Sequence, residues 1–209
     1  MADTFNVVYD ASDRISSITH EPPGIGKFAY EYNGTSSISF NIYDGIGNTN
    51  LTIHESYYLN SNQKVDSIFQ YNDTQDTFSA KFIYNQANFL IEARYYQNNS
   101  GGLAVLRTIE NYTYDAIGNR LTTLVKNASN NLLSTTNYTY NNILNNIWLV
   151  PVNLPLPNKN LPLTEVEINA LNVETSRLTY EYTFDSQSRV LAIKLSRSGI
   201  IVWKYFSYQ

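Results

Sequence analysis

A short pattern of residues recurs along the chain and constrains the fold more than any other feature. Its clearest copy is the ten residues from Tyr112 to Leu121, YTYDAIGNRL. Tyr182–Ile193 and Tyr9–Ile18 repeat the same order of aromatic, Asp, turn residue, basic residue and apolar residue. The remaining copies are looser and are anchored at Tyr32, Tyr58, Tyr84 and Tyr140. The anchors are mostly spaced by roughly 23–30 residues, as in repeat proteins.

Each copy predicts two antiparallel strands joined by a tight turn. Aromatic residues two apart, such as Tyr112 and Tyr114, lie on the same face of a strand. The following Asp or Asn starts a turn by accepting hydrogen bonds from nearby backbone amides. Gly118 stands where a hairpin favours a left-handed conformation. A basic and then apolar residues begin the returning strand.

The intervening segments also have the composition of strands. Ser36–Tyr43, Phe78–Tyr84 and Leu90–Tyr96 are rich in β-branched and aromatic residues, and so are Thr49–Tyr58, Leu121–Lys126 and Ile200–Tyr208. Thr164 and Glu167 could form a helical capping box, but the alternation of Val166 and Ile168 favours a strand. We therefore predict an all-β, antiparallel up-and-down meander of roughly 14 short strands. It would form either a curled sheet or a closed barrel.

The expected organisation is a single domain over residues 1–209. It contains an irregular, proline-rich insertion at about 141–162, because four of the six prolines fall between Pro151 and Pro162. This insertion includes Trp148 and is too apolar for an ordinary loop. We expect it either to cap one end of the sheet or to expose a surface for a partner.

Composition excludes several classes of protein. The chain has no cysteine, so disulfide scaffolds, cysteine-ligated zinc and thiol catalysis are excluded. It has 14 basic and 18 acidic residues, without the basic surplus of nucleic-acid binding proteins. Charged residues make up 15% of the chain, against about 25% in average domains. Low charge with abundant Tyr, Asn and Thr is typical of envelope and extracellular β proteins.

The segment from Tyr112 to Leu121 resembles the tyrosine–aspartate (YD, or Rhs-type) repeat. The looser spacing, together with Lys159-Asn160-Leu161-Pro162 and the hairpin from Tyr180 to Asp185, is similar to an uncharacterised family of Bacteroidetes envelope lipoproteins. That resemblance implies a porin-like β fold, export, and a lipid anchor upstream of the residues given. It implies no activity and no functional residues.

No arrangement of residues predicts catalysis, a metal site or a cofactor site. His54 and Glu55 are neighbours on a predicted strand and should point to opposite faces. Most tyrosines should pair across strands and stabilise the sheet. The candidate ligand or partner surface consists of aromatic residues, namely Trp148 and the doublets Tyr57-Tyr58 and Tyr95-Tyr96, because each doublet places one ring on each face.

These observations favour a non-enzymatic cell-envelope or extracellular domain with a binding or structural role. Its partner would be a glycan or an envelope protein, with no nucleic acid. We expect a monomer, attached peripherally to the membrane through a lipid anchor outside this chain rather than inserted, because the strands carry polar residues on both parities. Two alternatives remain open, a glycan hydrolase with dispersed carboxylates and a fragment of an Rhs-like encapsulating shell.

Overall fold

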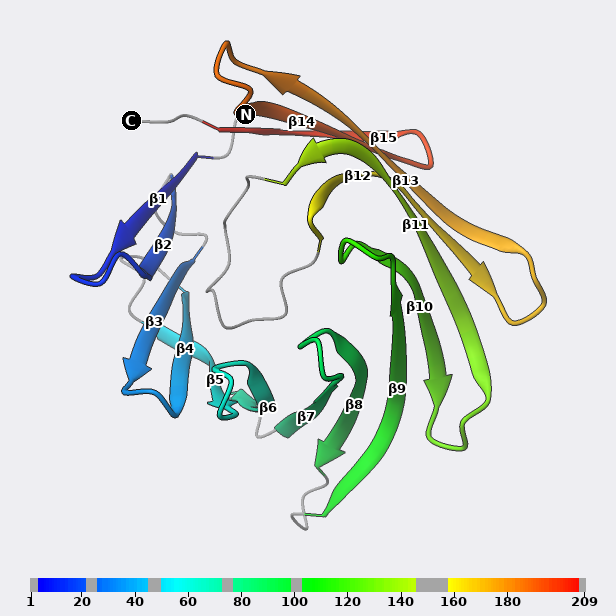
Figure 1. The fold of residues 1–209 in the computed structure, drawn as a ribbon. Helices are drawn as coiled ribbons and strands as arrows, with labels where there is room; N and C mark the ends of the chain where they lie inside the picture. The colour runs from blue at the N-terminus through cyan, green and yellow to red at the C-terminus, as the bar shows by residue number, and fades with distance from the viewer. Residues whose placement is uncertain are drawn as a thin grey trace. The chain divides into compact units, whose positions relative to one another are not determined.

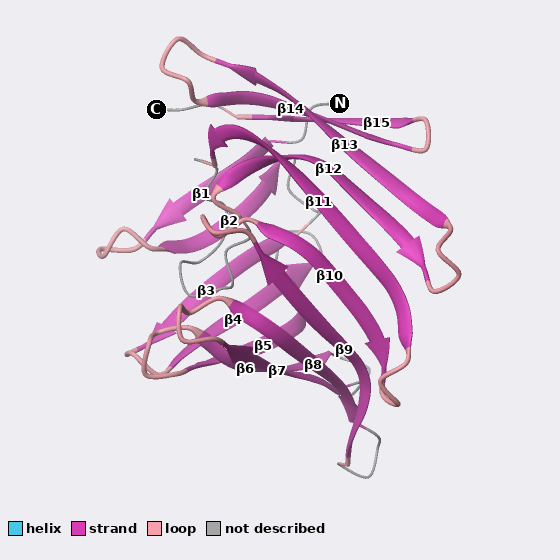
Figure 2. Cartoon of the chain, turned by 45° about the vertical axis from the view of Figure 1, so that its right-hand side comes forward, coloured by secondary structure: helices cyan, strands magenta, loops and turns pink. Residues whose placement is uncertain are grey.

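The computed structural model describes residues 4–21, 26–44, 50–72, 77–98, 103–145 and 158–206. Among these residues it contains 15 strands and no helix (Figures 1 and 2), and therefore no helix long and apolar enough to cross a membrane. The strands are β1 (Thr4–Tyr9), β2 (Ile15–Glu21), β3 (Lys27–Asn33), β4 (Ser37–Asp44), β5 (Asn50–Leu59), β6 (Val65–Asn72), β7 (Thr77–Tyr84), β8 (Leu90–Asn98), β9 (Ala104–Tyr114), β10 (Arg120–Asn127), β11 (Leu132–Leu144), β12 (Asn160–Asn169), β13 (Glu174–Phe184), β14 (Val190–Arg197) and β15 (Ile200–Tyr205).

The order of the strands in the sheet follows the order of the chain, from β1 to β15. The ladders between consecutive strands are antiparallel, as expected for a meander. The described strands form an open order, so the sheet alternative is found and the closed barrel is not. The chain forms one strand more than the roughly 14 predicted, and the capping-box segment at Thr164 lies in β12.

The chain divides into two compact units. In terms of described residues, the first unit holds β1 to β8 and the beginning of β9 up to Thr108. The second unit holds the rest of β9 from Ile109 and then β10 to β15.

Seven hairpin turns share one hydrogen-bonding pattern. An Asp or Asn side chain accepts hydrogen bonds, through Oδ1, from the backbone N–H groups two and four residues later. In the first hairpin, Asp10 accepts from Ser12 at 2.8 Å and from Arg14 at 3.0 Å. The seven residues are Asp10, Asn60, Asn85, Asp115, Asn127, Asn169 and Asp185. Each satisfies amides that the ladder leaves unpaired.

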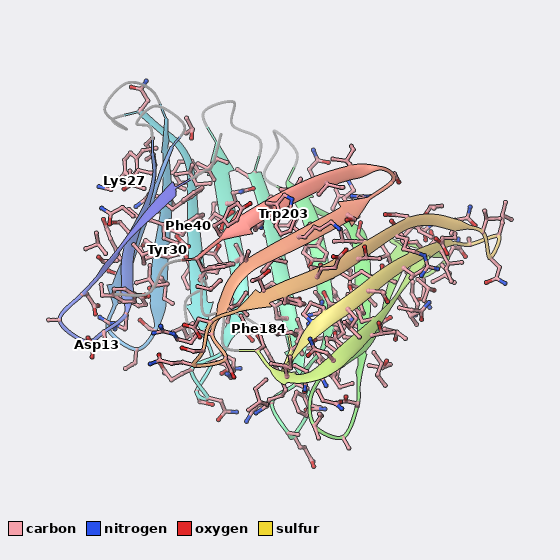
Figure 3. All side chains as sticks on the ribbon, turned by 90° about the horizontal axis from the view of Figure 1, so that it is seen from above. Asp13, Lys27, Tyr30, Phe40, Phe184 and Trp203 are labelled. Carbon is pink, nitrogen blue, oxygen red and sulfur yellow. The ribbon has the colours of Figure 1, made fainter. Side chains whose placement is uncertain are left out.

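The third residue after each of these Asp or Asn residues has a positive φ. Gly118 occupies this position in the clearest copy of the repeat, with φ of 98°. The other six positions hold Asp13, Gln63, Asn88, Asn130, Asn172 and Ser188. Figure 3 shows Asp13 at the tip of its hairpin. A single left-handed residue reverses the chain while the register shifts by a bulge next to the turn, as between Val8 and Tyr9.

The repeat predicts most of these turns. Turns follow Tyr9, Leu59, Tyr84, Tyr114 and Phe184, as the pattern indicates. The copy at Tyr140 does not form a hairpin turn, because β11 continues through it to Leu144. Two hairpins, at Asn127 and Asn169, have no aromatic anchor, so the repeat does not predict them. The cluster of Asn and Ser residues from 127 to 131 nevertheless indicates a break between strands at the first of them.

Both ends of the expected insertion at about 141–162 lie in strands. β11 extends to Leu144 and β12 begins at Asn160. Residues 146–157, which include Trp148, lie outside the described residues.

Each unit buries apolar side chains on one face of its strands. In the second unit, Leu161, Val190 and Ile193 are buried, and Tyr180, Tyr182 and Phe184 pack against them. We call this side of the second unit the core face. In the first unit the buried apolar residues are Ile15, Ile38, Tyr57, Val65, Ala80, Phe82, Leu90 and Ala93.

Tyrosine hydroxyl groups connect neighbouring hairpins. Tyr140 Oη donates to the carbonyl oxygen of Arg120, the first residue of β10, at 2.8 Å. The same contact joins Tyr32 to Ile15 at 3.1 Å, Tyr84 to Val65 at 2.7 Å and Tyr182 to Pro162 at 2.9 Å. Each bond crosses from one hairpin to the return strand of the preceding one, so the recurring tyrosine has a role in packing as well as in its own strand.

Candidate functional site

The residues predicted as a binding surface have different environments. Tyr57 is 8% exposed and donates a hydrogen bond to Glu55, whereas Tyr58 is 50% exposed. The doublet on β5 therefore presents one ring to solvent and buries the other. Tyr95 and Tyr96 are both half-buried, and Tyr95 stacks on Phe78 with ring centroids 5.8 Å apart. Within the described residues, Tyr58 and the second doublet do not lie around a common recess. Trp148 lies outside the described residues.

Cross-strand packing of aromatic rings occurs in the first unit. Tyr30 and Phe40, neighbours on β3 and β4, have ring centroids 4.8 Å apart (Figure 3). In the second unit, Tyr180 and Tyr182 instead stack along a single strand, 6.4 Å apart. The prediction of cross-strand tyrosine pairs therefore describes only part of the aromatic packing.

His54 and Glu55 make separate contacts. His54 Nδ1 lies 2.6 Å from Asn41 Oδ1, and its Nε2 lies 3.2 Å from Ser56 Oγ. Glu55 accepts hydrogen bonds from Tyr57 and from Gln70. The two side chains have different neighbours, so they do not act as a pair.

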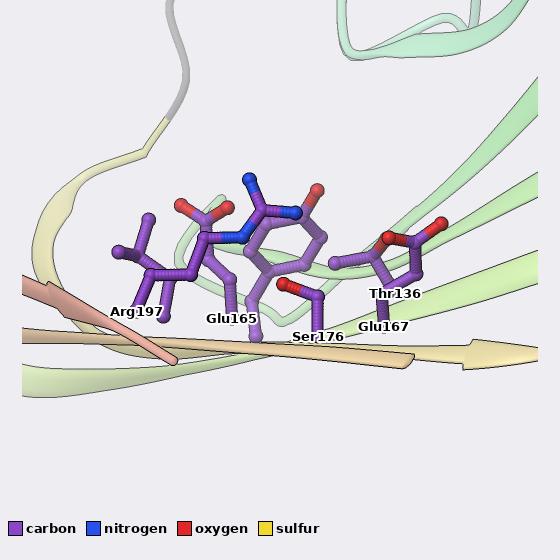
Figure 4. Close-up of a pocket in the computed structure, with 7 residues that line it drawn as sticks. Thr136, Glu165, Glu167, Ser176 and Arg197 are labelled. Atoms are coloured by element: carbon purple, nitrogen blue, oxygen red, sulfur yellow. The ribbon is translucent and has the colours of Figure 1, made fainter. Parts of the chain in front are cut away.

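A polar recess in the second unit is formed by two cross-strand rows of side chains. The first row contains Tyr138, Glu165, Leu178 and Arg197, which are register partners on β11, β12, β13 and β14. The second row contains Thr136, Glu167 and Ser176. These seven residues line the recess (Figure 4), whose volume is about 170 Å³. Drug-sized ligand pockets measure roughly 300–1,000 Å³, so this recess is smaller than such a pocket.

The recess lies on the core face, because Leu178 and Tyr180 are two residues apart on β13. In Figure 4 its labelled side chains stand on the same side of the strands. Leu178 is the one apolar member, and Tyr138 supplies an aromatic ring. Glu165 accepts a hydrogen bond from Tyr180 Oη. Within the described residues, the carboxylate of Glu167 and the guanidinium of Arg197 have no hydrogen bond or ion pair, so both are available to a ligand.

Sequence reasoning did not predict this recess. Glu165 and Glu167 alternate with Val166 and Ile168, which indicates that both carboxylates share one strand face. That alternation was a detectable signal for a polar surface. The partners from β11, β13 and β14 depend on the register of three ladders, which the sequence does not specify.

A second polar cluster lies at the start of β10. The guanidinium carbon of Arg120 lies 4.4 Å from the ring centroid of Tyr112 and 6.0 Å from that of Tyr138. Asn119 and Asn160 are buried and bond to each other, with Asn119 Oδ1 accepting from the Asn160 backbone N–H at 2.8 Å. Tyr138 contacts Arg120 in this cluster and also lines the recess.

Burial raises the pKa of several tyrosines. The pKa of Tyr30 rises to about 12, because burial disfavours the charged phenolate. Burial is also the main cause of the raised pKa values of Tyr57, Tyr140, Tyr180 and Tyr182. For Tyr57 and Tyr180, the hydrogen bonds to Glu55 and Glu165 raise the pKa further. These phenols are therefore hydrogen-bond donors at neutral pH and not bases.

Among the residues that the structure describes, no three His, Cys, Asp or Glu side chains are grouped as metal ligands would be. Exposed aromatic side chains do occur on β15, where Trp203 and Tyr205 stack with centroids 6.1 Å apart (Figure 3). They are 48% and 61% exposed. Neither residue lines the recess.

Two solved structures share the fold of this chain. A porin-like protein from Bacteroides uniformis superimposes with a TM-score of 0.61 at 14% identity, over 98% of this chain and 89% of that protein. A porin-like protein from Bacteroides vulgatus superimposes with a TM-score of 0.55, also at 14% identity, over 98% of this chain and 92% of that one. No protein-family model and no curated protein sequence matches this chain.

Proposed function

We propose that this chain is a non-enzymatic binding domain of the cell envelope that holds carbohydrate in the recess on the core face of its second unit. The observation that carries the proposal is the chemistry of the recess. Two carboxylates, two hydroxyl-bearing side chains, a guanidinium and a tyrosine ring line a volume of about 170 Å³.

A sugar unit needs both hydrogen-bond donors and acceptors, because each hydroxyl group can donate and accept. Glu165 and Glu167 accept from hydroxyl groups, and Arg197 donates to hydroxyl or ring oxygens. Tyr138 offers an apolar ring surface to the C–H groups of a sugar. Since Glu167 and Arg197 have no partner among the described residues, they need not break an existing interaction to bind.

The position of the two carboxylates does not favour hydrolysis. A glycosidase places two carboxyl groups on either side of the bond it breaks. Glu165 and Glu167 instead stand side by side on β12, and Glu165 already accepts from Tyr180. A binding role therefore accounts for the recess better than a catalytic one.

The location in the envelope rests on the similar structures and on composition. Both of the similar structures are of porin-like proteins from Bacteroides species. Low charge with abundant tyrosine agrees with an exported protein. Fractionation of the native cells tests this part of the proposal, and recovery of the chain from the cytoplasm would contradict it.

The recess is tested with a double variant and a matched control. A glycan array on the wild-type chain identifies a ligand, and calorimetry then compares Glu165→Gln/Glu167→Gln with Glu181→Gln. We expect the double variant to bind at least about tenfold more weakly, because an amide is a poorer acceptor than a carboxylate. Its amide oxygen can still accept from Tyr180, so the fold is retained.

Glu181 pairs with Lys194 at the surface, and its side chain is 63% exposed. It lies one residue from Tyr180 and Tyr182 and so on the opposite face, and its substitution should leave binding unchanged. Absence of binding to any glycan, or equal binding by the double variant, would overturn the proposal. Release of new reducing ends from the ligand would instead indicate a hydrolase.

A further inference from the structure

An arginine occupies a position that holds a buried apolar residue in four other hairpins. In each of five hairpins that connect an odd-numbered strand to the next one, the fifth residue after the turn Asp or Asn begins the returning strand. Four of these residues are Ile15, Val65, Leu90 and Val190, with exposed fractions of 7%, 0%, 5% and 0%. The fifth is Arg120.

The other arginines of these turns lie one position earlier and form ion pairs. Arg14 lies 2.6 Å from Asp10, and Arg189 lies 2.7 Å from Asp185. In the hairpin at Asp115 that earlier position is Asn119, whose side chain bonds to Asp115 Oδ2 at 2.9 Å. Arg120 is therefore separated from the turn carboxylate and placed on the strand.

The surroundings of Arg120 are aromatic. Its guanidinium lies against the rings of Tyr112 and Tyr138. The phenols of Tyr114 and Tyr138 interact with it electrostatically. Its Nε is buried and has no hydrogen-bond partner among the described residues. Burial of a charge is costly unless an opposite charge is close.

The described carboxylates of the second unit do not supply that opposite charge. Most of them are bonded elsewhere: Glu110 to Tyr112, Asp115 to Asn119, Glu165 to Tyr180, Glu174 to Arg177, Glu181 to Lys194 and Asp185 to Arg189. Glu167, in the recess, forms no ion pair within the described residues. Arg120 therefore has cation–π contacts and phenol neighbours, and among the described residues it has no carboxylate partner.

We propose that Arg120 binds the carboxylate of an acidic sugar whose neighbouring unit lies in the recess. The inference rests on the proposed function and specifies its ligand class. Tyr138 connects the two places, since its ring lines the recess and lies 6.0 Å from the guanidinium. A planar guanidinium held between rings can donate two parallel hydrogen bonds to a carboxylate.

The charges in the recess give the ligand a direction. Glu165 and Glu167 repel an anion, so the hydroxyl groups of the ligand face these two residues. The carboxylate of the ligand lies on the Arg120 side of Tyr138. A neutral glycan can fill the recess, but it leaves the guanidinium without an anion.

The test compares an oligosaccharide of uronic acid with the neutral oligosaccharide of the same sugar and linkage. Calorimetry measures both ligands on the full wild-type chain, Arg120→Leu and Arg177→Leu. We expect the wild type to bind the uronate at least about tenfold more tightly than the neutral ligand. Arg120→Leu should lose the preference and bind the two ligands with similar affinity. Arg177 lies on the opposite face and is paired with Glu174. The control variant Arg177→Leu removes the same charge and should preserve the preference for the uronate.

The outcomes separate the two proposals. If Arg120→Leu keeps the preference for uronate, or if the wild type binds the neutral ligand equally well, this inference fails and the proposed function stands. If the wild type binds neither ligand nor any other glycan, the proposed function fails and the inference with it. A thermal unfolding midpoint at or above that of wild type shows that Arg120→Leu is folded, as the leucine at the equivalent position 90 leads us to expect.

Discussion

At the scale of single residues, the turns depend on one left-handed position. Among the described residues, seven non-glycine residues have positive φ, and six of them lie in the repeated Asp or Asn turn. Asn and Asp adopt this conformation more readily than other side chains, because their short polar groups bond locally. Gln63, with φ of 60°, lacks that advantage.

Gln63→Gly should stabilise the chain. Glycine removes the contact between Cβ and the backbone that costs about 1–2 kcal/mol at a left-handed position, and part of that gain is offset by the greater entropy of the unfolded chain. The substitution also removes the exposed hydrogen bond that Gln63 Nε2 donates to the Thr35 carbonyl oxygen at 3.0 Å. We therefore expect a net increase of up to about 0.5 kcal/mol in the free energy of unfolding, measured in urea. Ser61→Gly, in the same turn but outside the positive-φ positions, should give no gain. Equal effects of the two substitutions would contradict the strain at Gln63.

The sequence predicts these turns only where an aromatic residue marks them. The Asp or Asn chemistry is local, so Tyr114-Asp115 and Phe184-Asp185 are recognisable. Asn127 and Asn169 form the same turn after Lys126 and Ile168, so no aromatic residue marks either turn as a copy of the repeat. The sequence therefore shows which residues can form such a turn more easily than it shows where along the chain the turns occur.

At the scale of strands and hairpins, the tyrosine hydroxyl bonds give the recurring tyrosines a role beyond their own strands. Tyr32, Tyr84, Tyr140 and Tyr182 each satisfy a carbonyl oxygen on the preceding hairpin. The pattern Tyr-x-Tyr predicts the strand but not this contact. The partner carbonyl belongs to another hairpin, about 20 residues earlier, and its place depends on the register.

Tyr182→Phe should destabilise the second unit. The substitution keeps the ring in the hydrophobic cluster and removes the bond to the Pro162 carbonyl oxygen, at a cost of about 1 kcal/mol in the free energy of unfolding. Tyr205→Phe is the control, because Tyr205 is 61% exposed. Chemical denaturation of both variants measures the difference. A Tyr205→Phe variant as unstable as Tyr182→Phe would indicate that the hydroxyl bond has no special role.

The hairpins also predict how stability depends on acid. The side-chain hydrogen bond from Arg14 is the main cause of the lowered pKa of Asp10, and the backbone N–H of Arg189 is the main cause for Asp185. A lowered folded pKa contributes stability above the ordinary value of 3.8, and the contribution is lost as the pH falls below it. The urea concentration at the unfolding midpoint should therefore decrease as the pH is lowered below 3.8. The decrease should be less steep in the double variant Asp10→Asn/Asp185→Asn. Identical slopes in the two proteins would contradict this.

At the scale of the whole molecule, function depends on features that no single segment contains. The recess joins four strands through the register partners Tyr138, Glu165, Leu178 and Arg197. The repeat and the strand pattern predict an antiparallel meander, and the meander is found. A local sequence pattern does not show which side chains become neighbours across three ladders. The surface predicted from the sequence and the recess therefore share no residue.

The tyrosines predict alkaline sensitivity of the whole chain. Burial raises the pKa of Tyr30 to about 12, and it raises those of Tyr57, Tyr140, Tyr180 and Tyr182 above their ordinary value of 10.0. Because the unfolded chain ionises these phenols at about pH 10 and the folded chain does not, their contribution to stability is complete below that pH. It is lost as the pH rises through the folded pKa values.

Tyrosinate absorbance and the urea midpoint, followed together from about pH 8 upwards, should therefore show two groups of phenols. Phenols on the exposed surface can ionise while the protein remains folded. The buried rings should ionise only as the ladders unfold, in a step that coincides with loss of the far-ultraviolet β signal. Since these phenols lie in both units, the step should involve both. Ionisation of all 18 tyrosines in one transition near pH 10, with the β signal intact, would show that the buried hydroxyl groups are accessible to solvent and that the hydroxyl bonds between hairpins do not hold them.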